Sequence, residues 1–287
     1  MDRRILGKTK LPISIITFGG ILVENYDAKK ANDLVAYAVD NDVNYVDMAP
    51  SYGNSQYVLG PALKPYRDKM YVACKTGKRD AKGAKEELLE SLVALKTDYF
   101  DIYQFHGVST VEDVKEIFGP NGAIETFEWA LKEGLIRNIG FTSHFNDRAI
   151  EMLDMYDFKS MLFPVNFALR KIKGLSEKPI SECITKDVGV VAINSLLDRK
   201  WKEGEEEDYH CWYKPIHDND TLATAALNYT LTQKGVTTAV PPGDERMFRK
   251  AVEIINAQGG SAKEISEGED NYLLEYAKGL EPDDFLF

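Results

Sequence analysis

Short runs of β-branched and aromatic residues alternate along the chain with segments whose apolar residues recur at helical spacing. The strand-like runs begin near Ile13, Asn44, Met70, Tyr99, Ile136, Met161, Gly189 and Thr237. Successive starts lie about 30 residues apart, the length of a strand with its crossover helix, and the last interval carries an insertion. In the first interval, apolar positions within 31–39 keep helical spacing after Asp27, a candidate N-cap. The pattern predicts a series of βα units.

Eight βα units in a chain of 287 residues predict an α/β protein with the (β/α)8 TIM barrel fold. Because no linker-like stretch divides the chain, residues 1–287 are predicted to form a single barrel domain. A doubly wound sheet is the alternative, but its first turn would carry G-x-G-x-x-G, and residues 17–22 lack the third glycine. We expect an N-terminal β-hairpin over 4–12 and a C-terminal helical extension over 264–280.

The charge balance and the N-terminus narrow the class of protein. Thirty-five Lys and Arg against 46 Asp and Glu give a net charge of −11, so no nucleic-acid partner is expected. The longest mostly apolar stretch, Leu11–Val23, is too short and too often interrupted to span a membrane, and no secretory signal is recognisable. Three widely spaced cysteines without C-x-x-C are typical of reduced thiols. We therefore expect a cytoplasmic protein.

Ionisable residues end three neighbouring predicted strands. Asp47 ends the second strand, Lys75 the third and His106 the fourth. Active sites of (β/α)8 barrels are built at these C-terminal strand ends. Tyr52 follows Asp47 in a tight loop bounded by Pro and Gly, so its phenol can fold back over the same mouth. Period-two alternation points Cys74 to the opposite face, where we expect a packed thiol.

An Asp, a Tyr, a Lys and a His at one barrel mouth indicate carbonyl chemistry. A lysine ammonium beside the phenol lowers the pKa of the tyrosine, an aspartate keeps that lysine charged, and a neutral histidine can hydrogen-bond a substrate oxygen. Each residue alone has a simpler explanation as a cap, a surface charge or a packing group. The combination is what predicts a catalytic site.

Three motifs, Asp47–Gly53, Lys75 and Gln104–Gly107, resemble the catalytic tetrad of the aldo-keto reductase superfamily. The resemblance extends from Gly19 to Gly243, which is most of the chain. It implies a (β/α)8 fold, a nicotinamide cofactor, usually NADPH, and no metal. It also implies reversible reduction of an aldehyde or ketone, so the partner is a small-molecule carbonyl substrate.

Carried over to this sequence, the resemblance gives each tetrad residue a role. Tyr52 would protonate the carbonyl oxygen as the general acid, and Lys75 would depress the pKa of Tyr52. Asp47 would pair with Lys75, and His106 would orient the carbonyl. The protein then supplies positioning and charge stabilisation, since the hydride comes from the cofactor. The identity of the substrate and the oligomeric state stay open at this point.

The resemblance also indicates which residues contact the cofactor. They are Gly20, Ile21, Asp47, Thr142, Ser143, Asn166, Ile193, Asn194, Ser195, Leu196, Pro241, Gly243, Arg246 and Arg249. Thr142, Ser143 and Asn166 match positions that hold the carboxamide. Ile193 stands where many members have a Tyr that stacks on the nicotinamide ring.

The turn after the eighth strand decides the expected choice between NADPH and NADH. Many relatives have a lysine for the 2′-phosphate at the place of Pro242. Gly243, which opens a helix, still offers backbone N–H groups to an anion. Arg246 and Arg249 could supply the missing charge or be ordinary surface residues. We expect NADPH to be preferred, by a smaller margin than in lysine-bearing relatives, with NADH possible.

The long last interval, Leu197–His217, is rich in aromatic and acidic residues and follows the seventh strand. It therefore emerges at the catalytic rim, where we expect a lid over the cofactor or a wall of the substrate pocket. His210, Cys211 and His217 match no closed zinc pattern, so no metal is expected.

Two other classes of function compete with the reductase. A barrel of this kind could bind a nicotinamide nucleotide as a redox sensor or regulatory subunit with little turnover, although the complete tetrad does not favour this. A metal-dependent barrel hydrolase would want an H-x-H pair at the first strand, where Phe18–Gly20 offers none. Steady-state aldehyde reduction separates the reductase from the sensor.

Overall fold

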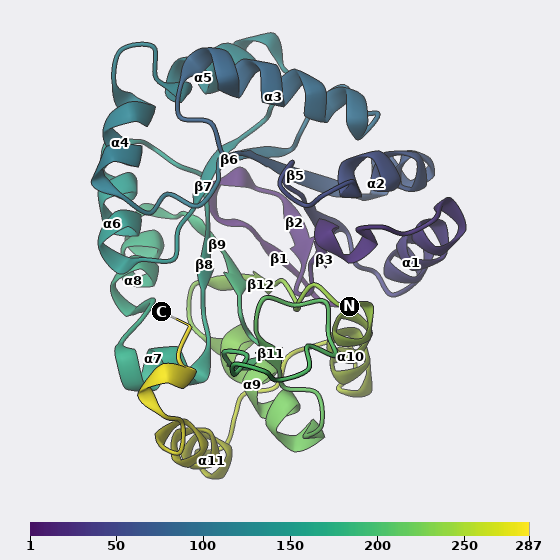
Figure 1. Ribbon diagram of the computed structural model, residues 1–287, viewed down its shortest axis with the longest axis vertical. Coiled ribbons are helices and arrows are strands. Elements are labelled where there is room, and N and C mark those ends of the chain that lie inside the picture. The colour runs from purple at the N-terminus through teal and green to yellow at the C-terminus, as the bar shows by residue number, and fades with distance from the viewer. Residues whose placement is uncertain (287) are drawn as a thin grey trace.

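Eight parallel strands form a barrel at the centre of the protein, seen in a computed structural model that describes residues 1–286 (Figure 1). The strands are β3 (Phe18–Gly19), β4 (Tyr45–Asp47), β5 (Tyr71–Thr76), β6 (Ile102–Phe105), β7 (Ile139–Thr142), β8 (Ser160–Pro164), β9 (Gly189–Ile193) and β12 (Val236–Ala239). Each pairs in parallel with the next. A parallel bridge between Ile16 and Ala239 joins the two ends of the sheet. The predicted (β/α)8 barrel is confirmed.

Alternation along the strands separates two buried faces. Tyr45, Ala73 and Ile102 point inward and form one cluster inside the barrel. Their neighbours Val46 and Cys74 belong to the larger core beneath the helices. Successive side chains of a strand point to opposite faces, so both faces of this enclosed sheet are apolar. Cys74 is thus fully buried on the outer face of the barrel, as predicted.

Helices surround the barrel and connect its strands (Figure 1). They are α1 (Ala28–Asp40), α2 (Ser55–Leu63), α3 (Ala81–Ala94), α4 (Val111–Phe118), α5 (Ala123–Glu133), α6 (Asn146–Met155), α7 (Phe167–Lys173), α8 (Glu177–Lys186), α9 (Asp220–Thr232) and α10 (Glu245–Ala257), with short 3-10 helices η2 (Gly20–Val23) and η3 (Lys64–Lys69). Asp27 caps α1 as expected, since its side chain accepts a hydrogen bond from the Lys30 amide at 2.8 Å. Within residues 1–286, no helix combines the length and the apolar character that a membrane crossing requires.

The N-terminal hairpin closes the floor of the barrel. Strand β1 (Arg3–Ile5) pairs antiparallel with β2 (Pro12–Ser14) through the 3-10 turn η1 (Gly7–Thr9). Leu6 and Ile13 belong to the cluster inside the barrel, so the hairpin plugs its lower end. The expected first strand from Ile13 is therefore divided: Ile13 lies in the hairpin, and the barrel strand begins at Phe18.

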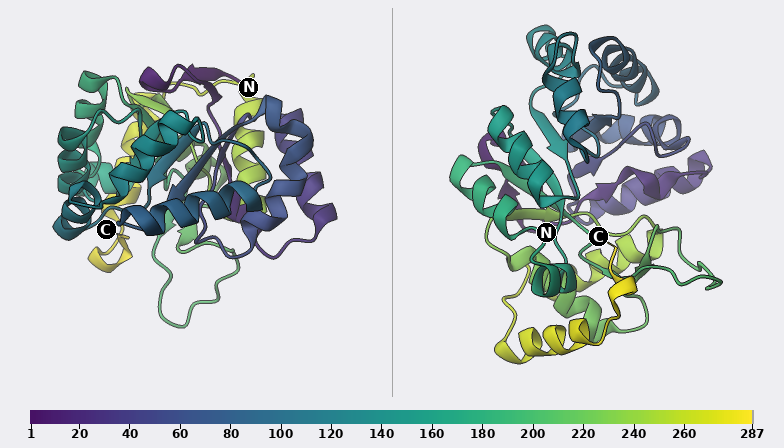
Figure 2. Two further views of the ribbon diagram at one scale, coloured as in Figure 1. Left: turned by 90° about the horizontal axis from the view of Figure 1, so that it is seen from above. Right: turned by 60° about the vertical axis from the view of Figure 1, so that its left-hand side comes forward.

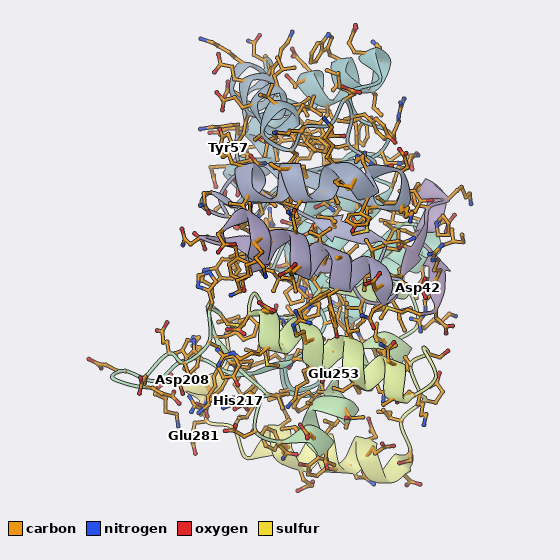
Figure 3. The ribbon with its side chains drawn as sticks, turned by 90° about the vertical axis from the view of Figure 1, so that its right-hand side faces the viewer. Asp42, Tyr57, Asp208, His217, Glu253 and Glu281 are labelled. Atoms are coloured by element: carbon orange, nitrogen blue, oxygen red, sulfur yellow. The ribbon has the colours of Figure 1, made fainter. Side chains whose placement is uncertain are left out.

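Two segments extend the barrel. Helix α11 (Glu267–Lys278) packs on α7 and α9 and precedes a short 3-10 helix, η4 (Pro282–Asp284), which confirms the C-terminal helical extension. After β9, strands β10 (Leu197–Arg199) and β11 (Lys214–Pro215) form an antiparallel ribbon. The loop between them, residues 200–213, projects from the body of the protein (Figure 2, left). Figure 3 shows this loop, labelled at Asp208, at the end of the molecule opposite Asp42, which follows α1.

Candidate active site

A cavity of about 490 Å³ lies at the C-terminal ends of the barrel strands. Asp47 at the end of β4, Lys75 in β5 and His106 just after β6 all line it. Tyr52 reaches the same cavity from the loop after β4. Gly53 has a φ of 52°, a left-handed conformation that glycine adopts without strain, and it helps this loop to turn back. The four residues of the predicted tetrad therefore meet in one place.

Lys75 and Asp47 form a buried ion pair on the floor of the cavity. Nζ of Lys75 donates to Oδ2 of Asp47 at 2.6 Å and to the carbonyl oxygen of Met48 at 3.1 Å. The side chains are 1% and 4% exposed. Burial alone would lower the pKa of Lys75, but the charge of Asp47 and the hydrogen bond to it raise this pKa above its ordinary value. Burial also raises the pKa of Asp47, and Lys75 opposes that shift.

The phenol ring of Tyr52 lies beside this pair, with its centroid 5.3 Å from Nζ of Lys75. Burial raises the pKa of Tyr52, and the Lys75 charge, which lowers it, only partly compensates. Lys75 lowers the pKa of Tyr52, as the sequence predicted, but the loss of hydration outweighs the attraction of one buried ammonium, so the net shift is upward. The phenol keeps its proton at neutral pH, which is the form that a general acid needs.

His106 stands across from Tyr52, with ring centroids 6.2 Å apart and planes at 88°. Its pKa is lowered to about 3 by burial first, and then by Lys75, His144 and Arg79. The imidazole is therefore neutral over the physiological range and can offer a hydrogen bond without adding charge. Arg79 also fixes the backbone here, since its Nη2 donates to the carbonyl oxygen of His106 at 2.8 Å.

The same cavity collects part of the predicted cofactor set. Its walls include Ile21, Asp47, Thr142, Ile193, Asn194, Pro241 and Gly243. Asn194 has a φ of 64° and a buried Oδ1 atom without a hydrogen-bond partner among residues 1–286. An unpaired buried amide oxygen at the cavity wall is suited to accept a bond from a carboxamide N–H. The flat aliphatic surface of Ile193 lies on the same wall.

The remaining predicted cofactor residues do not line this cavity; they are Gly20, Ser143, Asn166, Ser195, Leu196, Arg246 and Arg249. A side chain at Gly20 would meet the sulfur end of Met48 rather than the cavity. The Ser143 hydroxyl donates to the carbonyl oxygen of Val108 at 2.8 Å. Ser195 and Leu196 are fully buried.

Asn166 caps α7. Its Oδ1 accepts from the amides of Ala168 and Leu169, and its Nδ2 donates to the carbonyl oxygens of Asn194 and Leu197. All the hydrogen-bonding positions of the side chain are thus used within the protein. The expected carboxamide contact would have to break one of these bonds, so the structure supports a structural role for Asn166.

The two arginines expected at the 2′-phosphate are also engaged. Nε and Nη2 of Arg246 donate to the two carboxylate oxygens of Asp244 at 2.9 and 2.8 Å. Nε and Nη2 of Arg249 donate to Oε1 of Glu245 at 2.9 and 2.8 Å. The family resemblance pointed to the arginines, but it could not show that each has a carboxylate partner at the start of the same helix.

Several cavity residues were outside the predicted cofactor and catalytic set. They are Gly19, Ser51, His144, Leu162, Cys211, Trp212, Tyr213, Val240, Pro242 and Leu286. Three of them, Cys211, Trp212 and Tyr213, come from Leu197–His217. This segment therefore forms a wall of the cavity, which is one of the two roles that the sequence predicted for it. Trp212 lies with its ring centroid 6.2 Å from that of Tyr52. Leu286 reaches the cavity from the end of the chain, which no local sequence pattern indicates.

The second half of the 200–213 loop is hydrogen-bonded to the barrel. The amide of His210 donates to Oδ2 of Asp244 at 3.1 Å, and its ring bonds the Glu24 carboxylate at 2.8 Å. Nη2 of Arg246 donates to the carbonyl oxygen of Asp208 at 2.5 Å. His217 bonds the carbonyl oxygen of Pro215 instead of joining His210. Among residues 1–286, no group of three metal-ligating side chains occurs.

Comparison with known proteins agrees with this geometry. The aldo/keto reductase family model matches residues 15–247. The chain is 32% identical over 157 residues to an uncharacterized oxidoreductase, YqkF, and 30% identical over 162 residues to the aldo-keto reductase YhdN, both of Bacillus subtilis (strain 168). These matches cover 50% and 52% of this chain, and 49% and 46% of the relatives. The chain therefore spans about half the length of the curated relatives it matches.

The fold is shared over a longer stretch. The holo form of the aldo-keto reductase AKR11C1 from Bacillus halodurans superposes with a TM-score of 0.75 at 24% identity, covering 98% of this chain and 97% of that one. Its apo form gives 0.71. At 24% identity, this structural similarity shows that the two proteins share a fold. The family model, in contrast, extends over most of the sequence and includes all four residues of the tetrad, and the chain belongs to the aldo/keto reductase family.

Proposed function

We propose that this protein reduces an aldehyde or ketone to the alcohol, reversibly, with a nicotinamide nucleotide as hydride donor and Tyr52 as proton donor. One observation carries the proposal: a protonated phenol, a charged lysine and a neutral imidazole face one apolar-walled cavity, and the lysine is held by a buried carboxylate. This combination serves proton donation to a carbonyl oxygen better than any other common chemistry.

When bound, the nucleotide supplies a hydride to the carbonyl carbon. Tyr52 then gives its phenolic proton to the carbonyl oxygen. The Lys75 ammonium, 5.3 Å from the Tyr52 ring, stabilises the phenolate that remains. His106 donates a hydrogen bond to the same oxygen and fixes the direction of the carbonyl.

Asp47 acts through Lys75. Without a carboxylate at 2.6 Å, an ammonium this deeply buried would lose its proton and with it the charge that stabilises the phenolate. Around these polar groups, Ile193 and the buried Tyr213 present apolar surface to the cavity. Charge interactions between buried groups such as Lys75 and Asp47 are stronger than in water.

The residues present fit a nicotinamide ring. Asn194 has an unpaired buried amide oxygen, Ile193 offers an aliphatic face, and Thr142 lines the same cavity. The sequence favoured NADPH through Arg246 and Arg249. Both guanidinium groups are paired with carboxylates, so the hydride donor that we propose is a nicotinamide nucleotide, either NADPH or NADH.

The test is steady-state reduction of a panel of small aldehydes and ketones, followed by the loss of reduced-nucleotide absorbance. We expect multiple turnovers with at least one carbonyl compound and the reverse oxidation of its alcohol. Tight nucleotide binding without turnover of any carbonyl compound would instead indicate the redox sensor or regulatory subunit.

A cytoplasmic location stays a prediction.

A further inference from the structure

The main chain that carries His106 is bonded to the strand ends on both sides of it. The His106 amide donates to the carbonyl oxygen of Thr76, at the end of β5, at 2.9 Å. The amides of Gly107 and Val108 donate to Oγ1 and to the carbonyl oxygen of Thr142, at the end of β7, at 2.6 and 2.8 Å. Gly107 has a φ of 61°, which glycine adopts without strain, so the chain turns sharply directly after His106. The amides of this turn are therefore held by the barrel.

Two carbonyl oxygens of the same turn are bonded by Arg79, which lies in the loop between β5 and α3. Nη2 of Arg79 donates to the carbonyl oxygen of His106 at 2.8 Å and to that of Gly107 at 3.3 Å. A guanidinium is a planar fork of donors, so one arginine can bond several acceptors in a fixed geometry. Arg79 thus holds the main chain of the residue that presents the imidazole.

Asp113, in the first turn of α4, orients the guanidinium of Arg79. Its Oδ1 accepts from Nε of Arg79 at 2.8 Å, and its Oδ2 accepts from the amides of Ser109 and Thr110 at 2.8 and 2.9 Å. The same carboxylate completes a capping box with Thr110. Although burial opposes it, these donors lower the pKa of Asp113 to about 2. The carboxylate is therefore charged at neutral pH, and the start of the helix fixes its place.

The main chain of Arg79 is fixed as well. Its carbonyl oxygen accepts from the Ala123 amide at 2.7 Å, and the next residue, Asp80, forms an antiparallel bridge with Gly122. The Arg79 side chain is 12% exposed, and it does not line the catalytic cavity. Arg79 therefore acts on the reaction through the residues that it holds and not by contact with a substrate.

Two properties of His106 depend on Arg79. The first is the position of the imidazole, since a displacement of about 1 Å in an active site can cost roughly 10²-fold in rate. The second is its charge. After burial, Lys75 and His144, the Arg79 charge is a further cause that lowers the pKa of His106. A nearby cation disfavours the protonated ring, so Arg79 favours an imidazole that is both in place and neutral.

We propose that Arg79 is a positioning residue for the reduction: by bonding the carbonyl oxygens of His106 and Gly107, it keeps the imidazole directed at the carbonyl oxygen of the substrate. The inference rests on the proposed function, in which His106 bonds that oxygen. Arg79 was not among the site residues that the sequence predicted, because its bonds go to main-chain atoms of another loop.

The test is a double-mutant cycle between Arg79→Met and His106→Gln. Its readout is the single-turnover rate of hydride transfer at saturating reduced nucleotide and carbonyl compound. With His106 present, Arg79→Met should slow hydride transfer by roughly 10- to 100-fold. In the His106→Gln background it should slow transfer by no more than about twofold, because no imidazole is left to misplace. Nucleotide affinity should change by no more than about twofold, since Arg79 lies outside the cavity.

The matched control is Arg67→Met. Arg67 is 15% exposed and pairs with Asp101 at 3.1 Å. It also donates to the carbonyl oxygens of Met70 and Tyr99 at 2.8 and 3.0 Å, but it precedes β5, at the opposite end of the barrel from the catalytic cavity. Urea unfolding should therefore show comparable losses of stability for the two arginine variants. Hydride transfer in Arg67→Met should stay within about twofold of the native rate.

Should Arg79→Met not fold, Arg79→Lys keeps the charge but loses the fork, and it is expected to show the same dependence on His106 at a smaller size. A slowing by Arg79→Met no larger than that by Arg67→Met would overturn the inference. So would a slowing as large in the His106→Gln background as with His106 present. If the native protein bound nucleotide but transferred no hydride, the proposed function itself would fail, and the inference with it.

Discussion

The catalytic end of the site and its α10 end are both built on ion pairs, but in different surroundings. Lys75 and Asp47 project from adjacent strands and are almost completely buried. Arg246 and Asp244 begin a surface helix, and the Arg246 side chain is 57% exposed. In a buried ion pair the surrounding packing fixes each partner and the geometry between them. An exposed guanidinium can instead form an ion pair with any of several nearby carboxylates. The strands of the barrel therefore determine the ion pair at the catalytic end, whereas the neighbouring charged side chains determine the ion pair at the α10 end.

Removing the cation from each end should give the largest contrast. Lys75→Met leaves the Asp47 carboxylate buried and unpaired, so we expect the free energy of unfolding to fall by about 3–5 kcal/mol and turnover to be abolished. Arg246→Ala removes an exposed cation, and its cost should be about 0–1 kcal/mol. Urea unfolding of the two variants measures both effects. Similar losses of stability would mean that the two ends are not built differently.

Acid should weaken the catalytic end through His106. Its folded-state pKa of about 3 lies below the ordinary value of 6.5, so below pH 6.5 the unfolded chain binds a proton that the folded protein does not. The stability that His106 contributes is therefore complete above pH 6.5 and is lost as the pH falls toward 3, by at most about 1.4 kcal/mol per pH unit.

The measurement is the free energy of unfolding at pH 7 and pH 5 for the native protein and for His106→Gln. The native protein should lose about 2 kcal/mol more than the variant over this interval. His144, whose pKa is also lowered by burial, contributes equally to both proteins and cancels. Equal losses would show that the His106 imidazole titrates normally in the folded protein.

We expect bound nucleotide to change the protease sensitivity of the α10 end more than that of the catalytic end. The 200–213 loop is held there by Asp244 and Arg246, and internally by a bond of 2.9 Å from Nε1 of Trp201 to the Cys211 carbonyl oxygen. If nucleotide binds beneath the closed loop, a concentration of ten times its dissociation constant should slow proteolysis within 200–213 by about tenfold. Trp201→Phe should speed cleavage in its absence. Identical digestion with and without nucleotide would rule out a lid that closes over it.

The same contrast separates what the sequence predicted from what it did not. The spacing of the strand-like runs placed Asp47, Lys75 and His106 at one rim, because the register of a parallel barrel fixes which residues share a face. Cys74 faced outward for the same reason. These predictions needed only a period of two and the order of the elements.

The remaining features depend on partners that are distant in sequence. Asn166 caps a helix, Arg246 and Arg249 pair with carboxylates, and Leu286 reaches the cavity from the other end of the chain. The sequence showed that Lys75 lowers the pKa of Tyr52, but not that burial raises this pKa by more. Each of these features depends on tertiary contacts or on the loss of hydration, which the sequence alone does not show.

The most direct test of the central claim is a single-turnover measurement on native protein and Tyr52→Phe, both saturated with reduced nucleotide and mixed with an aldehyde that the native protein reduces. The variant removes one hydroxyl and leaves the Lys75–Asp47 pair in place. We predict that nucleotide affinity is nearly unchanged while hydride transfer slows by roughly 10²- to 10⁴-fold. Hydride transfer at more than about half the native rate would contradict the assignment of Tyr52 as the proton donor.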